Sequence, residues 1–301
     1  MTELRSTPED AGTRVDAFLA APLGSRSRAQ RLLEAGAVTV DGRAVLKSAK
    51  LVGGESIVVD ESLDPVEAPG IEPTHPGEPA AFEIAWEDAH LLVVDKPAGV
   101  VVHPARGHRS GTLAQALAGR VAGGEQDWRA GIVHRLDRDT SGLLVVAKSE
   151  RVHRELKEQL AAREITREYA ALVVGRPPAR SGTIDAPIGR DRKVRTRNST
   201  DTDQPREART HFELAEALAQ HTLLRVRLET GRTHQIRVHL QAIGFPVAGD
   251  PEYGTAGLLG LRRQFLHAER LSFTHPVTGE SVETTSPLPA DLVAALERAR
   301  G

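Results

Sequence analysis

A stretch rich in proline, glycine and glutamate divides this chain of 301 residues into two unequal parts. Within residues 61–81 the sequence DPVEAPGIEPTHPGEPA has no apolar periodicity, which is typical of an extended linker. Single domains usually contain roughly 100 to 200 residues, so a chain of this length has room for two. The sequence predicts a small domain over 12–60, an acidic linker over 61–81 and a large domain over 82–301.

The charge of the chain is unevenly distributed. Residues 61–90 contain eight Asp and Glu but no Lys or Arg, so the net charge of −2 leaves the remainder at +6 (−2 plus 8). Only six of the 39 basic residues are Lys, and Arg offers a planar donor fork for phosphates and a flat face for bases. A genome-wide codon bias would give the same Arg excess. The charge therefore permits a nucleic-acid partner without identifying one.

The composition disfavours several classes of protein. The absence of Cys excludes disulfides and thiolate metal sites, and the N-terminus lacks the apolar core of a secretory signal. These two features favour a cytoplasmic location. The longest apolar runs have the length of strands, so we expect no membrane span. We also expect a monomer. The twelve His form no compact ligand motif; His234 and His239, for example, fit one helical face poorly. We predict no metal and no organic cofactor.

The small domain is expected to combine two short helices with a strand hairpin. Asp41-Gly42 suits a tight turn between two strands, and Ser25 or Ser27 is a candidate cap for the second helix. The expected elements are helices at 14–19 and 28–35 and strands at 38–40, 43–45 and 57–59.

Three basic residues, Arg26, Arg28 and Arg31, fall on or just before the second of these helices. Residues three apart share a helix face, and a basic face beside a compact hairpin is able to bind a nucleic-acid backbone. An ordinary solvated helix face is the alternative interpretation.

The large domain is expected to be α+β, with a central mixed, largely antiparallel sheet flanked by helices and loops. Apolar segments of strand length alternate with helical patterns, and there is no internal repeat or Gly-rich phosphate loop. The expected strands are 82–86, 91–95, 143–147, 169–174 and 223–228, and the expected helices lie near 111–120, 150–162 and 234–243.

The loop at 134–142, His-Arg-Leu-Asp-Arg-Asp-Thr-Ser-Gly, is the most informative stretch for function. It places two carboxylates, two guanidiniums and an imidazole directly before a buried-looking strand, an arrangement on which sites are commonly built. Asp137 is the first candidate for a reacting group. Asp, Ser, Thr and Gly also form ordinary turns, so the loop alone leaves both interpretations open.

Longer motifs resemble known families. Residues 12–60 resemble the small S-four-like RNA-binding module, an α/β domain. The large domain resembles the pseudouridine synthases of the RluA/RluD family, and the form REITREY of its third motif matches the RluD branch. The stretches that carry this resemblance are LLVVDKPAGVVVHP (91–104), AGIVHRLDRDTSGLLVVAK (130–148), REITREYAALVVG (163–175), LETGRTHQIRVHL (228–240) and LHAERLSFTHPVTGE (266–280).

The resemblance implies the pseudouridine synthase fold and isomerisation of uridine within RNA, most directly large-subunit ribosomal RNA or a pre-ribosomal particle. It gives Asp137 the role of catalytic carboxylate, with Arg237 as its counter-ion and Tyr169 against the uracil ring. Arg135 would fill the gap left when the target nucleotide flips out of the RNA. A helix-start Arg, a packed strand Tyr and a simple phosphate contact are the respective structural alternatives.

Further RNA contacts are expected around this centre and in a basic run at 189–197, which we interpret as an exposed, mobile loop. Asp139 and Ser141 are expected to shape the catalytic loop, and Thr233 to cap the helix that carries Arg237. The additional candidate contacts are His134, Thr140, Lys96, Arg106, Arg232, Gln235, Arg190, Arg192 and Lys193.

Two other functions remain open at this stage. A non-catalytic RNA-binding or ribosome-assembly protein would use the same basic surfaces, with the acidic loop as architecture. An RNA N-glycosidase would use similar carboxylate chemistry but let water capture the sugar, releasing free base.

Overall fold

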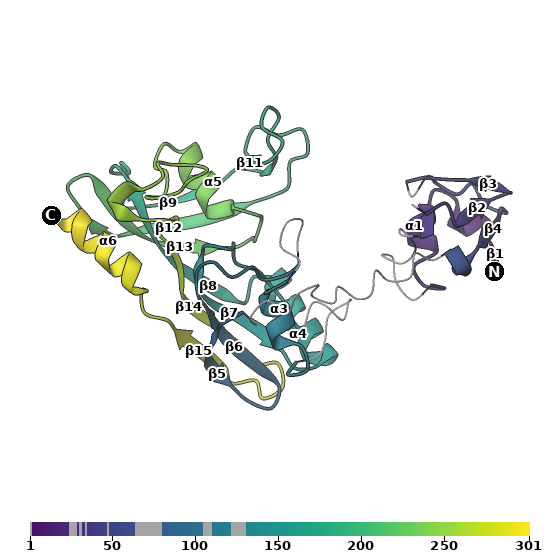
Figure 1. The fold of residues 1–301 in the computed structure, drawn as a ribbon, viewed down its shortest axis with the longest axis horizontal. Coiled ribbons are helices and arrows are strands. Elements are labelled where there is room, and N and C mark those ends of the chain that lie inside the picture. Colours follow the sequence, from purple (N-terminus) through teal and green to yellow (C-terminus); the bar gives the residue numbers. More distant parts are fainter. Residues whose placement is uncertain are drawn as a thin grey trace. The chain divides into compact units, whose positions relative to one another are not determined.

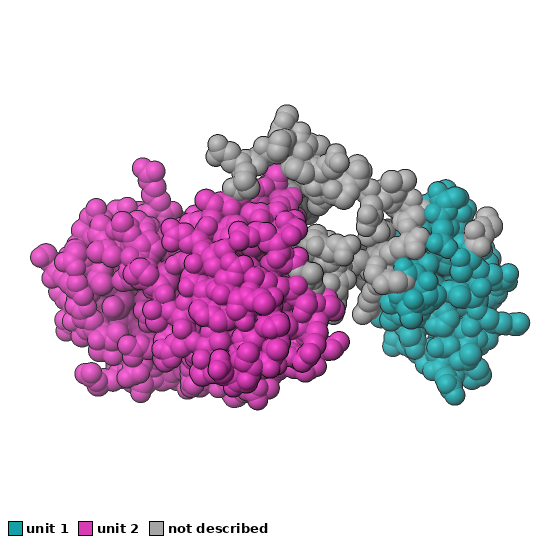
Figure 2. All heavy atoms as spheres, turned by 90° about the horizontal axis from the view of Figure 1, so that it is seen from below, with its two compact units in different colours: residues 1–75 teal, residues 76–301 magenta. Residues whose placement is uncertain are grey.

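The computed structural model describes residues 2–23, 29, 32, 33, 35–46, 48–63, 80–104, 110–121 and 131–301. The chain forms two compact units, residues 1–75 and residues 76–301, which are coloured separately in Figure 2. No helix within the described residues is long and apolar enough to span a bilayer.

The small unit contains a four-stranded sheet with the order β1-β4-β2-β3. The predicted hairpin is confirmed: β2 and β3 pair antiparallel, and Asp41 and Gly42 between them have φ of 48° and 74°. The first strand, which pairs with β4, lies before the predicted domain start and was missed. The elements are β1 (Thr2–Arg5), a 3-10 turn (Pro8–Asp10), α1 (Val15–Phe18), β2 (Val38–Val40), β3 (Arg43–Ala44), β4 (Ser56–Val59) and a second 3-10 turn (Glu61–Leu63).

The described part of the second predicted helix packs into this unit. Ala29, Leu32 and Leu33 are buried in one apolar cluster with α1 and the sheet. The side chains proposed to bind RNA from this helix, Arg26, Arg28 and Arg31, lie outside the described residues, as do Ser25, Ser27, Arg106 and residues 64–79 of the predicted linker.

The large unit is built on a nine-stranded sheet. Its order is β5-β6-β7-β14-β8-β13-β12-β9, with β15 paired to β14. The β7–β14 pair is parallel and the other pairs are antiparallel, which confirms the predicted mixed, largely antiparallel sheet. In Figure 1, β5, β6 and β15 lie toward one end of this sheet, and β9 and β12 toward the other.

The five predicted strands and three predicted helices of the large domain are present, and all but one of them have shifted ends. The helix at 150–162 is reproduced at both ends, because Ser149 accepts a hydrogen bond from Val152 N and Arg163 ends the helix in the left-handed conformation. The elements in this group are β5 (Glu83–Glu87), β6 (Leu91–Lys96), α3 (Leu113–Leu117), β7 (Ser141–Ala147), α4 (Glu150–Ala162), β8 (Thr166–Val174), β13 (His221–Leu228) and α5 (Gln235–Ala242).

Several strands and the last helix were missed. The most consequential is β14, which lies between β7 and β8 in the middle of the sheet although its sequence, LHAERLSFT, mixes apolar and polar residues irregularly. The missed elements are β9 (Ser181–Asp185), β10 (Gly189–Arg190), β11 (Asn198–Ser199), β12 (Arg209–Ala217), a 3-10 turn (Leu258–Gly260), β14 (Leu266–Thr274), β15 (Ser281–Thr285) and α6 (Ala290–Arg300).

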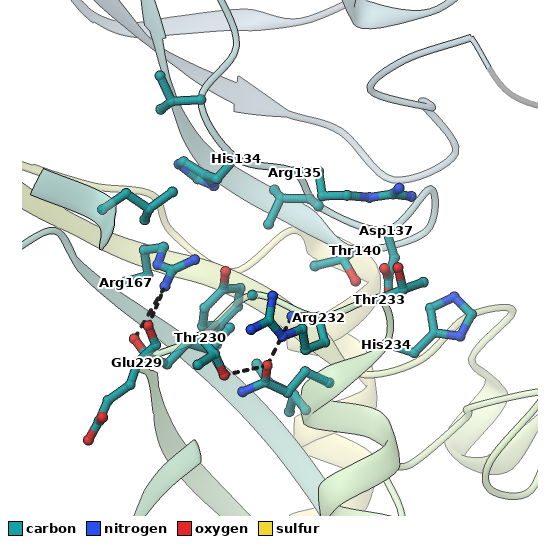
Figure 3. Close-up of a pocket in the computed structure, with 18 of the residues that line it drawn as sticks. His134, Arg135, Asp137, Thr140, Arg167, Glu229, Thr230, Arg232, Thr233 and His234 are labelled. Atoms are coloured by element: carbon teal, nitrogen blue, oxygen red, sulfur yellow. Dashed lines mark hydrogen bonds between the residues drawn. The ribbon is translucent and has the colours of Figure 1, made fainter. Parts of the chain in front are cut away.

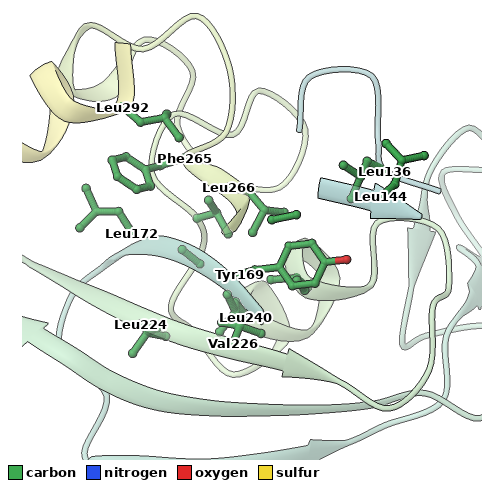
Figure 4. Packing of buried hydrophobic residues seen from close by; sticks show 14 of the residues in the cluster. Leu136, Leu144, Tyr169, Leu172, Leu224, Val226, Leu240, Phe265, Leu266 and Leu292 are labelled. Carbon is green, nitrogen blue, oxygen red and sulfur yellow. The ribbon is translucent and has the colours of Figure 1, made fainter. Parts of the chain in front are cut away.

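Helices cover both faces of the sheet. Alternate residues of β6 separate between two apolar clusters: Leu92 and Val94 pack with α3, α5 and α6, whereas Leu91 and Val93 pack with α4. Figure 4 shows part of the first cluster, in which Tyr169 lies among Leu136, Leu240 and other apolar side chains. This core therefore reaches the edge of the loop at 134–142.

The close parallel contact of β7 with β14 requires a glycine. Gly142 has φ 110°, and a Cβ there would collide with the backbone of Ala268. The glycine thereby lets the loop at 134–142 end directly against β14.

Candidate active site

A cleft of about 820 Å³ opens beside the loop at 134–142. Its walls come from distant parts of the chain: the loop itself, the start of β8, the C-terminal half of α4 and the segment that joins β13 to α5. Figure 3 shows Asp137 on one side of this cleft and Arg167 on the other. The fold thus brings the second, third and fourth sequence motifs to one cavity.

The carboxylate of Asp137 lies at the cleft wall. Its loop closes through a hydrogen bond of 3.2 Å from Thr140 N to Asp137 O, and Arg237 Nη1 donates to Asp137 Oδ2 at 3.3 Å. The side chain of Asp137 keeps 16% of its surface exposed, so one carboxylate is both paired with a cation and open to the cavity. The predicted pairing with Arg237 is present.

Arg237 is held by more than Asp137. Its Nε and Nη2 donate to the two oxygens of Asp250 at 2.7 and 2.9 Å, and Nη2 also lies 3.4 Å from Glu252 Oε2. The guanidinium carbon stands 4.9 Å from the ring centre of Tyr253. Burial opposes the charge, but the hydrogen bonds and attraction from Asp250, Asp137 and Glu252 outweigh it and raise the pKa of Arg237.

The sequence reasoning did not single out Asp250, Glu252 and Tyr253. Asp250 is fully buried, and its Oδ1 accepts hydrogen bonds from the backbone N–H groups of Glu252 and Tyr253, so the same carboxylate shapes its own turn. Asp-Pro is a known turn signal, and the stretch GDPEYG at 249–254 carried that signal. Its link to Arg237 required the tertiary structure.

Lys96 does not have the predicted role in RNA contact. Its side chain is fully buried, and Nζ donates hydrogen bonds of 2.9 Å to the backbone carbonyls of Pro97, Val100 and Arg138. Burial lowers the pKa of Lys96 to about 7, with attraction from Asp137 and Asp139 acting in the opposite direction. Lys96 therefore anchors the backbone of the loop at 134–142 through its hydrogen bond to Arg138 O.

Two side chains before β14 also anchor this loop. Arg263 Nη1 donates to Asp139 O at 3.0 Å and to Ser141 Oγ at 3.2 Å, and Gln264 Nε2 donates to Thr140 Oγ1 at 3.1 Å. Thr140 is 2% exposed and lines the cleft, so its contact with RNA stays a prediction. The loop-shaping interpretation of Ser141 agrees with these bonds.

Tyr169 lines the cleft from β8 and is 4% exposed. Burial raises the pKa of its phenol; nearby Arg167 opposes this shift, and Asp137 adds to it. Tyr169 therefore presents a neutral ring near neutral pH.

The comparisons with known proteins agree with this geometry. Residues 90–242 match the RNA pseudouridylate synthase family, and residues 13–58 match the S4 domain. The chain belongs to the RNA pseudouridylate synthases. Members of this family are isomerases that act on RNA, and the S4 domain is an RNA-binding module. Both units of the synthase therefore belong to families that bind RNA.

Relatives cover nearly the whole synthase. It is 43% identical to the uncharacterized RNA pseudouridine synthase YlyB of Bacillus subtilis, over 99% of this chain and 98% of that protein. It is 45% identical to the ribosomal large subunit pseudouridine synthase D of Nitrosomonas europaea, over 96% and 85%. Among solved structures, human RNA pseudouridylate synthase domain containing 1 is 29% identical with a TM-score of 0.55, over 72% of this chain and 87% of that one.

Arg135 and His134 differ in exposure within the synthase. Arg135 is exposed and lines the cleft, as its predicted role requires. His134 Nε2 accepts a hydrogen bond from Val145 N at 3.3 Å, and burial, together with Arg167 and Lys157, lowers the pKa of His134 to about 3. His134 is therefore a neutral ring in the cleft wall.

The side chain of Gln235, which we predicted to contact RNA, forms its hydrogen bonds with other groups of the protein. Its Oε1 accepts from Thr230 Oγ1 and Arg232 N, and its Nε2 donates to Arg209 O and Thr210 Oγ1, at 2.8 to 3.0 Å. Gln235 is 3% exposed, so this prediction was wrong. Arg232 remains half-buried at the cleft, where its Nε donates to a backbone carbonyl.

In the basic run at 189–197, which we expected to be an exposed, mobile loop, residues 189–190 form a strand and residues 191–197 form the loop that joins it to β11. β10 and β11 pair antiparallel, and the buried Asp191 accepts hydrogen bonds from Lys193 N and Val194 N at its tip. Arg190, Arg192 and Lys193 are exposed, and Arg192 is paired with Asp201 and Asp203. The carboxylates of Asp191, Asp201 and Asp203, which are close in sequence, thus hold this basic segment in a defined conformation.

No group of three or more His, Asp or Glu is arranged to hold a metal ion among the residues that the structure describes.

Proposed function

We propose that this synthase converts uridine to pseudouridine in large-subunit ribosomal RNA, with Asp137 as the catalytic carboxylate. The observation that supports Asp137 is its position: a partly exposed carboxylate at the cleft wall, held by the buried cation Arg237. The RNA class is supported by relatives of 41% to 45% identity that are named ribosomal large subunit pseudouridine synthase D.

The reaction rearranges one nucleotide and consumes no other reactant. The bond from uracil N1 to ribose C1′ breaks, C5 bonds to C1′, the hydrogen on C5 leaves and N1 gains one. An ionised carboxylate at the sugar captures or stabilises the separated fragments. Arg237 donates a hydrogen bond to Asp137 Oδ2 and so holds this carboxylate at the cleft wall.

Tyr169 and Arg135 have complementary proposed roles. The neutral phenol of Tyr169 packs against the uracil and, through its hydroxyl, relays the proton that leaves C5. A paired uridine must leave its stack to reach the cleft, at a cost on the order of a few kcal/mol. The exposed guanidinium of Arg135, two residues from Asp137, takes the vacated place in the RNA by stacking.

The small unit supplies affinity in this proposal. Its S4 domain would add phosphate contacts to those of the cleft and the hairpin at 189–199, on free RNA or a pre-ribosomal particle bound by a monomer. Removal of residues 1–60 should then weaken RNA binding and reduce its dependence on salt; an unchanged salt slope would contradict this role.

The catalytic proposal is tested by Asp137→Asn, with Asp139→Asn as its matched control. Both variants lose one carboxylate from the same loop, but the carboxylate of Asp139 pairs with the exposed Arg138. Chromatography of nucleosides from treated RNA should show at least a ~10³-fold slower formation of pseudouridine for Asp137→Asn and little change for Asp139→Asn.

The same experiment separates the competing functions. Equal pseudouridine formation by the native protein and Asp137→Asn would refute the role of Asp137. Tight binding without any modification by the native protein would favour an assembly protein, and release of free uracil would identify an N-glycosidase.

A further inference from the structure

Arg167 is a buried cation with an incomplete set of partners. It lies on β8, two residues before Tyr169 and therefore on the same face of the strand, and it lines the cleft at 6% exposure. Its Nη2 reaches the carbonyls of Leu228 and Glu229 at 3.4 Å, and its Nε has no hydrogen-bond partner within the described residues. These long bonds satisfy a guanidinium poorly.

The two carboxylates that line the cleft near Arg167, those of Glu229 and Glu207, form ion pairs with other side chains. Glu229 is paired with Arg163, Arg209 and His211, and Glu207 is paired with Arg163. No carboxylate of the described residues lies within 4 Å of the guanidinium of Arg167. A charge buried without a counter-ion is costly, so Arg167 lacks what most buried guanidiniums have.

The local structure makes room for this cation. A Cβ on Gly231 would lie 3.0 Å from Arg167 Nη1, so glycine lets the loop between β13 and α5 pass close to the guanidinium. Lys157, exposed on α4, also lines the cleft, and both Lys157 and Arg167 act electrostatically to lower the pKa of His134. In Figure 3, Arg167 lies between His134 and Glu229, across the cleft from Asp137. The Arg167 side of the cleft therefore concentrates positive charge.

We infer that Arg167, together with Lys157, forms a subsite for one backbone phosphate of the RNA strand near the target uridine. The inference rests on the proposed function. Phosphodiesters are the anionic groups that an RNA substrate carries near neutral pH, and a guanidinium fork suits their oxygens. A neutral uracil carbonyl would accept a hydrogen bond but would leave the buried charge unbalanced.

Stability distinguishes a ligand-binding role from a structural one. Arg167→Met keeps most of the side-chain volume and removes the unpaired charge, so the ligand-free variant should unfold at an equal or higher temperature than the native protein. A lower unfolding temperature would mean that the bonds to Leu228 and Glu229 hold the fold together, and it would overturn the inference. Arg225→Met, on an exposed Arg of β13, controls for the loss of an Arg as such.

Neutral linkages in the RNA test the partner directly. A large-subunit RNA fragment is prepared with one methylphosphonate at a time in the linkages around the target uridine. Each modified nucleotide carries a 2′-O-methyl group, which is also present in the matched phosphodiester RNA. Single-turnover pseudouridine formation is then measured for the native protein, Arg167→Met and Arg225→Met.

One linkage should behave differently from the rest. Its neutralisation should slow the native protein and Arg225→Met by about tenfold to a hundredfold, while Arg167→Met, already slowed by a similar factor on ordinary RNA, should lose little more. Independent, multiplicative losses at every linkage would overturn the subsite. Absence of pseudouridine formation by the native protein would instead refute the proposed function, so the two failures are distinguishable.

Discussion

The two sides of the cleft contain the same kind of residue in opposite electrostatic situations. Arg237 and Arg167 are both buried, at 5% and 6% exposure. Arg237 lies among three carboxylates, those of Asp137, Asp250 and Glu252. Among the described residues, Arg167 donates hydrogen bonds to the backbone carbonyls of Leu228 and Glu229 and has no carboxylate partner. Burial raises the cost of a charge equally in both places, so only the partners distinguish them.

This difference separates a pre-organised side from a ligand-dependent side. Arg237 has its carboxylate partners before RNA arrives, which fixes the orientation of Asp137. Arg167 has no carboxylate partner among the described residues, and we propose that an RNA phosphate becomes its partner. The ion pairs of Arg237 thus stabilise the fold beside the reacting group. The poorly partnered Arg167, in contrast, lowers the stability of the ligand-free protein where we propose that an RNA phosphate binds.

The largest stability effect is expected from Asp250→Asn, which removes the ion pair between Asp250 and the buried Arg237. This change leaves Arg237 with only its longer contacts, and removal of one partner from a buried pair typically costs about 3–5 kcal/mol. Urea denaturation should show that loss, together with slower pseudouridine formation. Asp201→Asn, at an exposed pair, should change stability by less than about 1 kcal/mol. Equal effects of the two variants would show that Asp250 does not stabilise Arg237.

A smaller effect is expected from Lys96→Met, which leaves the charges around Arg237 in place but loosens the loop of Asp137. The carbonyls of Pro97, Val100 and Arg138 lose the hydrogen bonds from Lys96, and we expect a loss of about 2–3 kcal/mol in the free energy of unfolding. Pseudouridine formation should slow as well, because Arg138 O keeps only its hydrogen bond from Gly99 N. Lys50→Met, at an exposed Lys, is the control for denaturation. Unchanged activity would mean that the loop keeps its shape without this anchor.

The smallest effect near neutral pH is expected on the Arg167 side, at His134, and it grows as the pH falls. The pKa of His134 is lowered to about 3 in the folded protein, by burial and then by Arg167 and Lys157. Between pH 6.5 and about 3 the unfolded chain takes up a proton that the folded protein does not, so this group makes stability fall as the pH falls. Its contribution to the slope is at most about 1.4 kcal/mol per pH unit.

Urea denaturation across this pH range should therefore give a shallower acid-side slope for His134→Leu than for the native protein. Above pH 7.5 the imidazole is neutral in both states, so the difference in stability between the two proteins should be constant there. Identical acid-side slopes would contradict the neutral state of His134 in the fold.

Local sequence signals predicted local structure well. The ends of α4 follow from Ser149 as a cap and from apolar spacing within the helix, and the turn at Asp41-Gly42 follows from residues that tolerate positive φ. β14 was missed because its mixed sequence has no clean alternation. It becomes a strand through pairing with β7 on one side and β8 on the other, and these partners are distant in the sequence.

The candidate site also combines features that the sequence predicts with features that depend on the tertiary structure. The sequence by itself determined which chemical groups are available: the carboxylate of Asp137 in a loop before a buried strand, the cation of Arg237 at a helix start, and the motifs of the family. Only the tertiary structure decided what surrounds them. It buried Lys96 and Gln235, joined Arg237 to Asp250 and, in the part of the chain that the structure describes, paired no carboxylate with Arg167. Burial and ion pairing depend on segments that meet in space, and no local pattern encodes that meeting.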